Sequence, residues 1–383
     1  MLLALASNGF VLQSLSFALP ELVRDWGVRG ADLSLAFTLH LLGISLGAFS
    51  FGYLGDRQGR RTMLLASAAL QALATLACPL AQSPLQIGLL RLVAGIGVGG
   101  MTPNVVALAM ELSPRRGRTP LTAIVLSGVA FGSSLPALVA PALIPAYGWT
   151  SLFWLAGSCT VLLLAALALW MPESRLYLAR RSAHARFTDL FTGRLALTTT
   201  CLWMMYAGTM LAMHLITSWL PLLLEREGLG ARRAAGLTGL VHLAGAAGML
   251  CSTALLGHLG RAWLIGLLAV AFTSVSMIAL EGFASDQLGL LIAGLGFGMV
   301  GCQGTLGAIA GQVYPSSCRT TGVGAAIAVG RLGSLLGPLA GGAFQAAGYS
   351  AQGLFTLPLW ALGAAIAAAI VFTLRTGHQT GGS

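Results

Sequence analysis

Residues 52–61 read GYLGDRQGRR, a short charged stretch that lies between two long apolar runs. The run before it, residues 31–54, and the run after it, residues 62–82, are each long enough for a membrane-spanning helix, which needs about 20 apolar residues. Charged loops between apolar helices are typical of proteins that cross a bilayer several times. The stretch therefore indicates a helical hairpin in a membrane.

The composition of the whole chain agrees with this interpretation. Of 383 residues, 56% are hydrophobic and only 8% are charged, whereas soluble domains carry about 25% charged residues. So few charges cannot cover the surface of a soluble protein. The apolar runs are long, rich in glycine and without period-two alternation, so we expect helices and not a β-barrel.

Breaking the chain at charges and at proline and glycine clusters predicts twelve spans. They are 1–23, 31–54, 62–82, 85–111, 119–143, 148–171, 195–224, 233–257, 261–281, 286–313, 319–347 and 351–374. The predicted fold is an all-α membrane protein of two pseudo-symmetric six-helix bundles. The predicted domains are a bundle at 1–171, a cytoplasmic loop at 172–194, a bundle at 195–375 and a short polar tail at 376–383.

The arginines predict the orientation. All 21 basic residues are arginine, and placing both termini in the cytoplasm puts fourteen of them inside, five outside and two within spans. Cytoplasmic loops carry the excess of positive charge in membrane proteins. This rule accounts for the net charge of +10 without a nucleic-acid partner.

The two halves of the chain also resemble each other. VAGIGVGG at 93–100 has a counterpart in IAGLGFGM at 292–299, and GYLGDR at 52–57 has one in GHLGRA at 257–262. Repeated helix bundles with a site between them near the middle of the membrane are typical of transporters.

Several motifs give the chain a specific resemblance. GYLGDRQGRR at 52–61 resembles the signature loop of the major facilitator superfamily, RLVAGIGVGG at 91–100 resembles its fourth-helix motif, and MPES at 171–174 resembles the end of its sixth helix. Four further stretches resemble the aromatic acid:proton symporter family, above all its hydroxyphenylpropionate-type carriers. They are LQSLSFALP (12–20), TPNVVALAMELSPRRGRT (102–119), LITSWLPLLLEREGLG (215–230) and RTTGVGAAIAVGRLGSLLGPLAGG (319–342).

The resemblance implies a monomeric inner-membrane carrier that imports a small aromatic or related organic carboxylate, with the proton gradient as energy source and no cofactor. Such carriers have an acid-Gly-x-acid pattern in the first helix, where this chain has Asn8, Gly9, Phe10 and Val11. Positions 8 and 11 share one helix face. Neither side chain titrates, so an uncoupled facilitator or exchanger of organic anions stays open as an alternative.

Arg331 is the first candidate for binding the substrate. It lies in the middle of span 319–347 between Gly330 and Gly333, which leave room for a helix or a ligand. An arginine within a membrane should face a cavity or a partner, and its planar fork suits a carboxylate; the alternative is a structural arginine bonded to carbonyls. The other candidates are Gln303, His242, His214, Tyr206, Trp203 and Asn8, of which Trp203 and Tyr206 could stack on an aromatic ring or could be packing residues.

Four residues are candidates for coupling. Arg91 matches the family's fourth-helix arginine, to which the resemblance assigns a coupling role. Glu111 is too far along the same span to pair with it, and a place in the cytoplasmic charge network is the favoured alternative. His214 and His242 are the mid-span side chains that titrate near neutrality, so either could replace the missing acids.

The charged stretch itself is interpreted as a gate. A carboxylate at Asp56, beside arginines and facing a helix N-terminus, could hold the cytoplasmic side closed and then release it. The predicted gating residues are Gly52, Asp56, Arg57, Arg60 and Arg61.

Other functions are less well supported. An exporter of drugs or metabolites would have the same fold, although Arg331 favours anions over cationic drugs. A transporter-like sensor would be expected to carry an added signalling domain, and the polar tail is short. No nucleophile–base spacing, metal cluster or phosphate-binding loop indicates an enzyme.

Overall fold

The computed structural model describes residues 1–112, 118–171, 195–314 and 319–377, although a few side chains in these ranges, including that of Asp56, are not described. All regular elements within these ranges are helices. They are α1 (Leu2–Trp26), η1 (Gly30–Leu33), α2 (Ser34–Gln58), α3 (Arg60–Ala77), η2 (Cys78–Leu80), α4 (Pro84–Leu112), α5 (Arg118–Tyr147), α6 (Thr150–Trp170), α7 (Leu195–Arg226), α8 (Ala231–Leu259), α9 (Arg261–Glu281), α10 (Leu288–Val313), α11 (Arg319–Ala346), α12 (Ala351–Leu354) and α13 (Thr356–Gly377).

Twelve helical segments in the described ranges are long and apolar enough to cross a membrane, and each coincides with one predicted span. The all-α fold with twelve spans is therefore confirmed. The last span differs in detail, because it is interrupted at Phe355 between α12 and α13. Pro358 explains the break, since proline has no N–H to donate to the carbonyl of Leu354.

The described chain forms two compact units. Unit 1 consists of Met1–Arg181, Thr217–Leu243 and Pro338–Tyr349, and unit 2 consists of Ser182–Ile216, Ala244–Gly337 and Ser350–Ser383. The predicted loop at 172–194 and most of the predicted tail lie outside the described residues. The predicted bundle boundaries stay a prediction.

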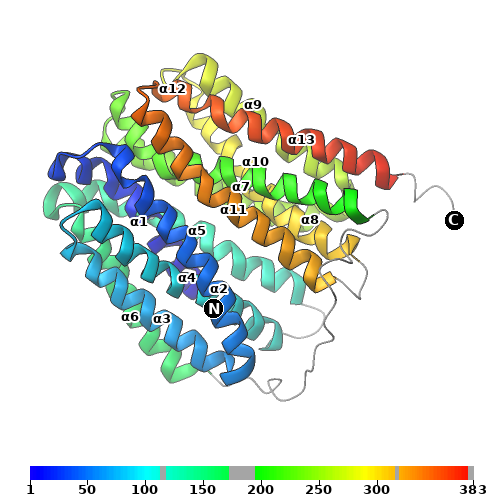
Figure 1. Cartoon of the computed structure of the whole chain (residues 1–383), viewed down its shortest axis with the longest axis horizontal. Coiled ribbons are helices and arrows are strands. Elements are labelled where there is room, and N and C mark those ends of the chain that lie inside the picture. The colour runs from blue at the N-terminus through cyan, green and yellow to red at the C-terminus, as the bar shows by residue number, and fades with distance from the viewer. Residues whose placement is uncertain (113–117, 172–194, 315–318, 378–383) are drawn as a thin grey trace. The chain divides into compact units, whose positions relative to one another are not determined.

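Glycines let the helices of unit 1 approach closely. In this unit α2 packs against α4, α1 against α5 and α3 against α6 (Figure 1). A methyl group on Gly47 would lie 2.0 Å from the carbonyl oxygen of Ile96, and one on Gly99 would lie 2.0 Å from that of Ile44. Both distances are far shorter than a van der Waals contact, so the contact between α2 and α4 requires glycine in the 93–100 motif.

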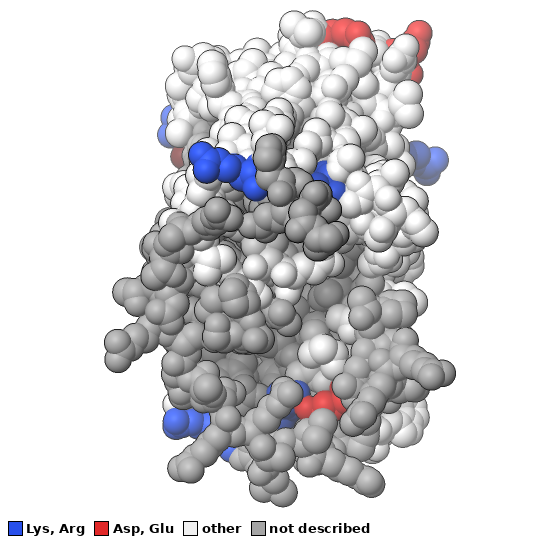
Figure 2. Space-filling model, turned by 90° about the vertical axis from the view of Figure 1, so that its right-hand side faces the viewer, with Lys and Arg blue, Asp and Glu red and all other residues white. Residues whose placement is uncertain are grey.

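Glycine also allows a close contact between two helices of unit 2. A methyl group on Gly248 of α8 would lie 2.2 Å from the carbonyl oxygen of Phe297 in α10, whose sequence is the counterpart of the 93–100 motif. The α9 helix packs against both α10 and α13. On the face that Figure 2 shows, the described surface is mostly white, and the described basic and acidic side chains lie in a few small patches.

Candidate functional site

Arg331 lies in the middle of α11 and is half-buried. Its guanidinium makes no hydrogen bond or ion pair with another described residue, and the hydroxyl of Ser334 donates to its carbonyl oxygen. The α7 helix occupies the space beside the flanking glycines. A methyl group on Gly330 would lie 3.3 Å from Cβ of Tyr206, and one on Gly333 would lie 2.3 Å from the carbonyl oxygen of Ala207. The two glycines thus allow α7 to pack closely against α11, and the guanidinium of Arg331 has no bond to a described residue.

His214 stands near Arg331 in unit 2. It is half-buried on α7, and its Nδ1 lies 3.0 Å from the carbonyl oxygen of Met210. A carbonyl only accepts, so this geometry assigns the hydrogen to Nδ1 and leaves Nε2 to take up a proton. The α11 helix, which carries Arg331, packs against α7 here, since a methyl group on Gly337 would lie 3.3 Å from the carbonyl carbon of His214. Arg331 and a protonated His214 therefore repel each other.

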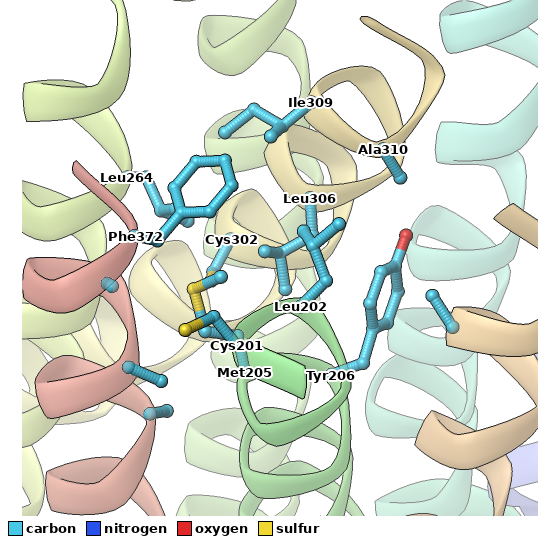
Figure 3. Close-up of a cluster of buried hydrophobic side chains, with 14 of the residues drawn as sticks. Cys201, Leu202, Met205, Tyr206, Leu264, Cys302, Leu306, Ile309, Ala310 and Phe372 are labelled. Carbon is cyan, nitrogen blue, oxygen red and sulfur yellow. The ribbon is translucent and has the colours of Figure 1, made fainter. Parts of the chain in front are cut away.

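Tyr206 lies on the same helix but is buried, with 3% of its surface exposed. It belongs to a hydrophobic cluster of unit 2 that includes Leu202, Met205, Cys302 and Phe372. Figure 3 shows its ring at the edge of this cluster, with the hydroxyl pointing away from Phe372. The ring is a packing group in this arrangement, and its contact with a substrate ring stays a prediction.

Trp203 lies one turn before Tyr206 on α7 and is half-buried. It packs from outside against the same hydrophobic cluster. Its predicted stacking on a substrate ring also stays a prediction.

Gln303 adds a hydrogen-bond donor in unit 2. The residue is half-buried on α10, and its Nε2 is enclosed without a hydrogen-bond partner among the described residues. Gly307, four residues later and so on the same helix face, is close to Tyr206, since a methyl group there would lie 3.5 Å from the hydroxyl. The structure thus places the amide of Gln303, like Arg331 and His214, on helices that meet around Tyr206.

Asn8 is buried in unit 1, and its polar group is engaged with α4. The side chain is 1% exposed, and its Nδ2 donates to the carbonyl oxygen of Val98 at 3.0 Å and to the hydroxyl of Thr102 at 3.3 Å. Its Oδ1 is enclosed without a partner among the described residues. The predicted contact of Asn8 with substrate stays a prediction.

Arg91 is fully buried and bonds to the backbone of α1. Its Nη1 donates to the carbonyl oxygen of Val11 at 2.6 Å and its Nη2 to that of Leu12 at 3.0 Å. No described carboxylate forms an ion pair with it, and Glu111 lies elsewhere, as expected. Arg91 therefore reaches position 11, the second of the two first-helix positions at which the resemblance led us to expect an acid.

The charged stretch at 52–61 contacts its own half of the chain. Arg60 forms an ion pair with Glu111, and Arg61 donates to the carbonyl oxygen of Ala168 at 2.6 Å. The coupling role of Glu111 and its place in a cytoplasmic charge network both stay predictions. Arg57 stacks over the ring of Tyr53 in the same helix, 4.4 Å from its centroid.

Gly52 lies within α2, and a methyl group added there would lie 3.7 Å from the ring of Pro103. The side chain of Asp56 lies outside the described part of the chain. The gating role of all five residues stays a prediction.

His242 makes a contact that sequence reasoning did not find. The residue is 4% exposed on α8, and its Nε2 lies 2.6 Å from Nε2 of Gln13 on α1, within unit 1. Nearby, Ser16 donates to the carbonyl oxygens of Thr217 and Ser218. Pro221 is the feature of the sequence that could have indicated the contact between Ser16 and Thr217. Proline has no N–H, so the carbonyl of Thr217 lacks its usual donor within the helix.

Comparisons with known proteins agree with this architecture. Residues 1–338 match the Major Facilitator Superfamily. The gallate transporter of Pseudomonas putida is 33% identical to this chain, with 97% of the chain and 89% of the relative covered. The 3-(3-hydroxy-phenyl)propionate transporter of Escherichia coli (strain K12) is also 33% identical, with coverages of 96% and 91%.

A solved structure shows the same fold. The crystal structure of a bacterial homologue of the human lysosomal transporter Spinster, in an inward-facing and occupied conformation, superposes with a TM-score of 0.74 at 16% identity, covering 97% of this chain and 93% of that one. The chain therefore belongs to the Major Facilitator Superfamily of membrane transporters, and it is a carrier and not an enzyme.

Proposed function

We propose that this chain imports a small aromatic carboxylate across the bacterial inner membrane by alternating access, as a monomer with both termini in the cytoplasm. The observation that carries the proposal is the guanidinium of Arg331, which lies at mid-span without a partner among the described residues. A planar carboxylate would accept two parallel hydrogen bonds from it. The printed names of the relatives, which include a gallate transporter and a 4-hydroxybenzoate transporter, support the aromatic part.

The same geometry supports proton coupling. Arg331 and a protonated His214 would repel each other, because both would carry positive charge on the packed helices α11 and α7. A carboxylate bound at Arg331 would offset this repulsion, so the anion and a proton would bind more tightly together than apart. His214 would then carry the proton that the first-helix acids carry in the related symporters, with His242 as the second candidate.

An uncoupled facilitator is the second candidate function. Asn8 and Val11 do not titrate, and Arg91 bonds to backbone carbonyls where the symporters have an acid. A carrier of this kind would let the substrate equilibrate and would not concentrate it.

The test is uptake of labelled gallate, 4-hydroxybenzoate and 3-(3-hydroxyphenyl)propionate into proteoliposomes, with and without an inward proton gradient. Accumulation above equilibrium in the gradient supports symport, and equilibration at the same rate in both conditions supports the facilitator. His214→Asn and His242→Asn are compared for accumulation and for exchange of internal against external substrate. A symporter that uses His214 keeps exchange and loses accumulation in the first variant only. No flux of any of the three acids would disprove the substrate class.

A further inference from the structure

An apolar groove runs along the contact between α5 and α8 in unit 1. Its volume is about 450 Å³, and its lining is almost entirely aliphatic and aromatic. The α5 side contributes Phe131, Leu135 and Leu138, and the α8 side contributes Leu237, Leu240 and Leu243. The lining residues of this groove belong to unit 1, whereas Arg331, His214 and Gln303 belong to unit 2.

Two small residues explain why the groove is hollow. A methyl group on Gly239 would lie 2.4 Å from Cβ of Ala137, so the two helices touch at this point. One turn earlier, a methyl group on Gly236 would have no neighbour within 4 Å. The helices therefore meet at Gly239 and leave an open channel beside Gly236.

The length of the groove matches one leaflet of a bilayer. Along α8 it extends from Arg233 to Leu243, and ten residues of helix rise about 15 Å, which is half of a hydrocarbon core of about 30 Å. The outer walls face away from the protein, since Leu138 is 74% exposed and Phe131 and Leu243 are each 46% exposed. The groove thus leads from the level of the lipid head groups towards the middle of the membrane.

The polar end of the groove carries a free positive charge. Arg233 lines this end and is exposed, and it makes no hydrogen bond or ion pair with any residue that the structure describes. Arg24, in the adjacent part of unit 1, is by contrast paired with Glu21 and Glu225. Glu21 and Glu225 are thus engaged by another arginine, and the guanidinium of Arg233 makes no ion pair with a described residue.

We propose that this groove binds one anionic phospholipid, with an acyl chain lying between α5 and α8 and the phosphate at Arg233. An apolar channel of one-leaflet depth with a cation at its outer end has the chemistry of such a lipid. A basic side chain near an anionic head group contributes about 1 kcal/mol. The proposal does not depend on the transported substrate.

The experiment is native mass spectrometry of the purified full chain after incubation with phosphatidylglycerol or with phosphatidylethanolamine of the same acyl chains. We expect the protein to retain phosphatidylglycerol more strongly. Arg233→Gln should lower this retention about fivefold, the factor that corresponds to about 1 kcal/mol. Arg232→Gln is the matched control, because Arg232 is its exposed neighbour and does not line the groove.

A second variant tests the acyl chain. Gly236→Phe would place a ring in the open channel, and we expect it to lower the retention of both lipids. Arg233→Lys keeps the charge and should retain phosphatidylglycerol. Equal retention of the two lipids by the unmodified protein, or equal losses in Arg233→Gln and Arg232→Gln, would overturn the proposal. Substrate uptake is measured on the same samples, so that failure of the lipid site is distinguished from failure of the transport function.

Discussion

Arg91 and Arg331 both lie within membrane spans and neither has a described carboxylate partner, yet their surroundings differ. Arg91 is fully buried in unit 1 and donates to the carbonyl oxygens of Val11 and Leu12. Arg331 is half-buried in unit 2, and its guanidinium has no partner among the described residues. Two nitrogens of the Arg91 guanidinium are bonded within the protein, whereas we propose that the guanidinium of Arg331 binds a substrate carboxylate.

This difference shows that an intramembrane charge alone does not define a substrate site. Any arginine at bilayer depth must be compensated, because leaving water costs it several kcal/mol. Compensation by backbone carbonyls makes the residue part of the packing. An arginine whose charge is instead balanced by a bound substrate anion is a binding group. The four predictions below test this distinction, from the largest expected effect to the smallest.

Arg331→Gln should lower the kcat/KM for uptake of the carboxylate about 100-fold, because it removes two charge-assisted hydrogen bonds. Arg331→Lys keeps the charge but loses the planar fork, so we expect a smaller loss, of about tenfold. Uptake into proteoliposomes gives both values, and thermal unfolding in detergent controls for folding. Uptake by Arg331→Gln at the rate of the unmodified protein would contradict the proposal that Arg331, unlike Arg91, binds the substrate.

Arg91→Ala should mainly destabilise the protein. The side chain is among the largest that are fully buried, and its removal leaves both a cavity and two carbonyls without their donor, at a cost of about 2–4 kcal/mol. The measurement is the unfolding midpoint in detergent, with Arg91→Met as the volume-matched control. If Arg91→Met unfolds at the normal temperature and no longer binds substrate, Arg91 belongs to the binding site.

Val11→Asp should restore a carboxylate partner for Arg91. Asn8 and position 11 share the face of α1 that meets α4, because Asn8 bonds to Val98 and Arg91 reaches the backbone of Val11. We expect the Asp to be tolerated beside Arg91 but not in the Arg91→Met background, with a coupling energy of about 1–3 kcal/mol. A double-mutant cycle on unfolding measures it, and additive effects would place the new carboxylate out of reach of Arg91.

Ser16→Ala should have the smallest effect. It removes the donor that serves the carbonyls of Thr217 and Ser218 beside Pro221, and polar contacts inside membrane proteins average about 0.6 kcal/mol. The unfolding midpoint should fall slightly while uptake stays unchanged, as expected for another internally satisfied group of unit 1. The control is Ser14→Ala, since Ser14 donates only to Phe10 of its own helix.

The number and limits of the spans could be predicted from sequence because hydropathy and charge act locally. A run such as 62–82 is long, apolar and bounded by arginines, so it must lie in the bilayer whatever it packs against. The glycines at 93–100 indicate that another helix can approach closely there, but only the structure identifies this helix as α2. The interruption at Phe355 was missed, although Pro358 carries its signal.

The candidate site was only partly predictable. The sequence by itself determined that Arg91, Arg331, His214 and Gln303 lie within the membrane and must be compensated, because that cost depends on depth alone. The tertiary structure decided which partners the polar groups within the spans find: Nη1 and Nη2 of Arg91 donate to carbonyls of α1, and His242 contacts Gln13. Partners that lie 80 to 229 positions apart in the chain cannot be inferred from local pattern, since helix packing alone brings them within hydrogen-bonding distance.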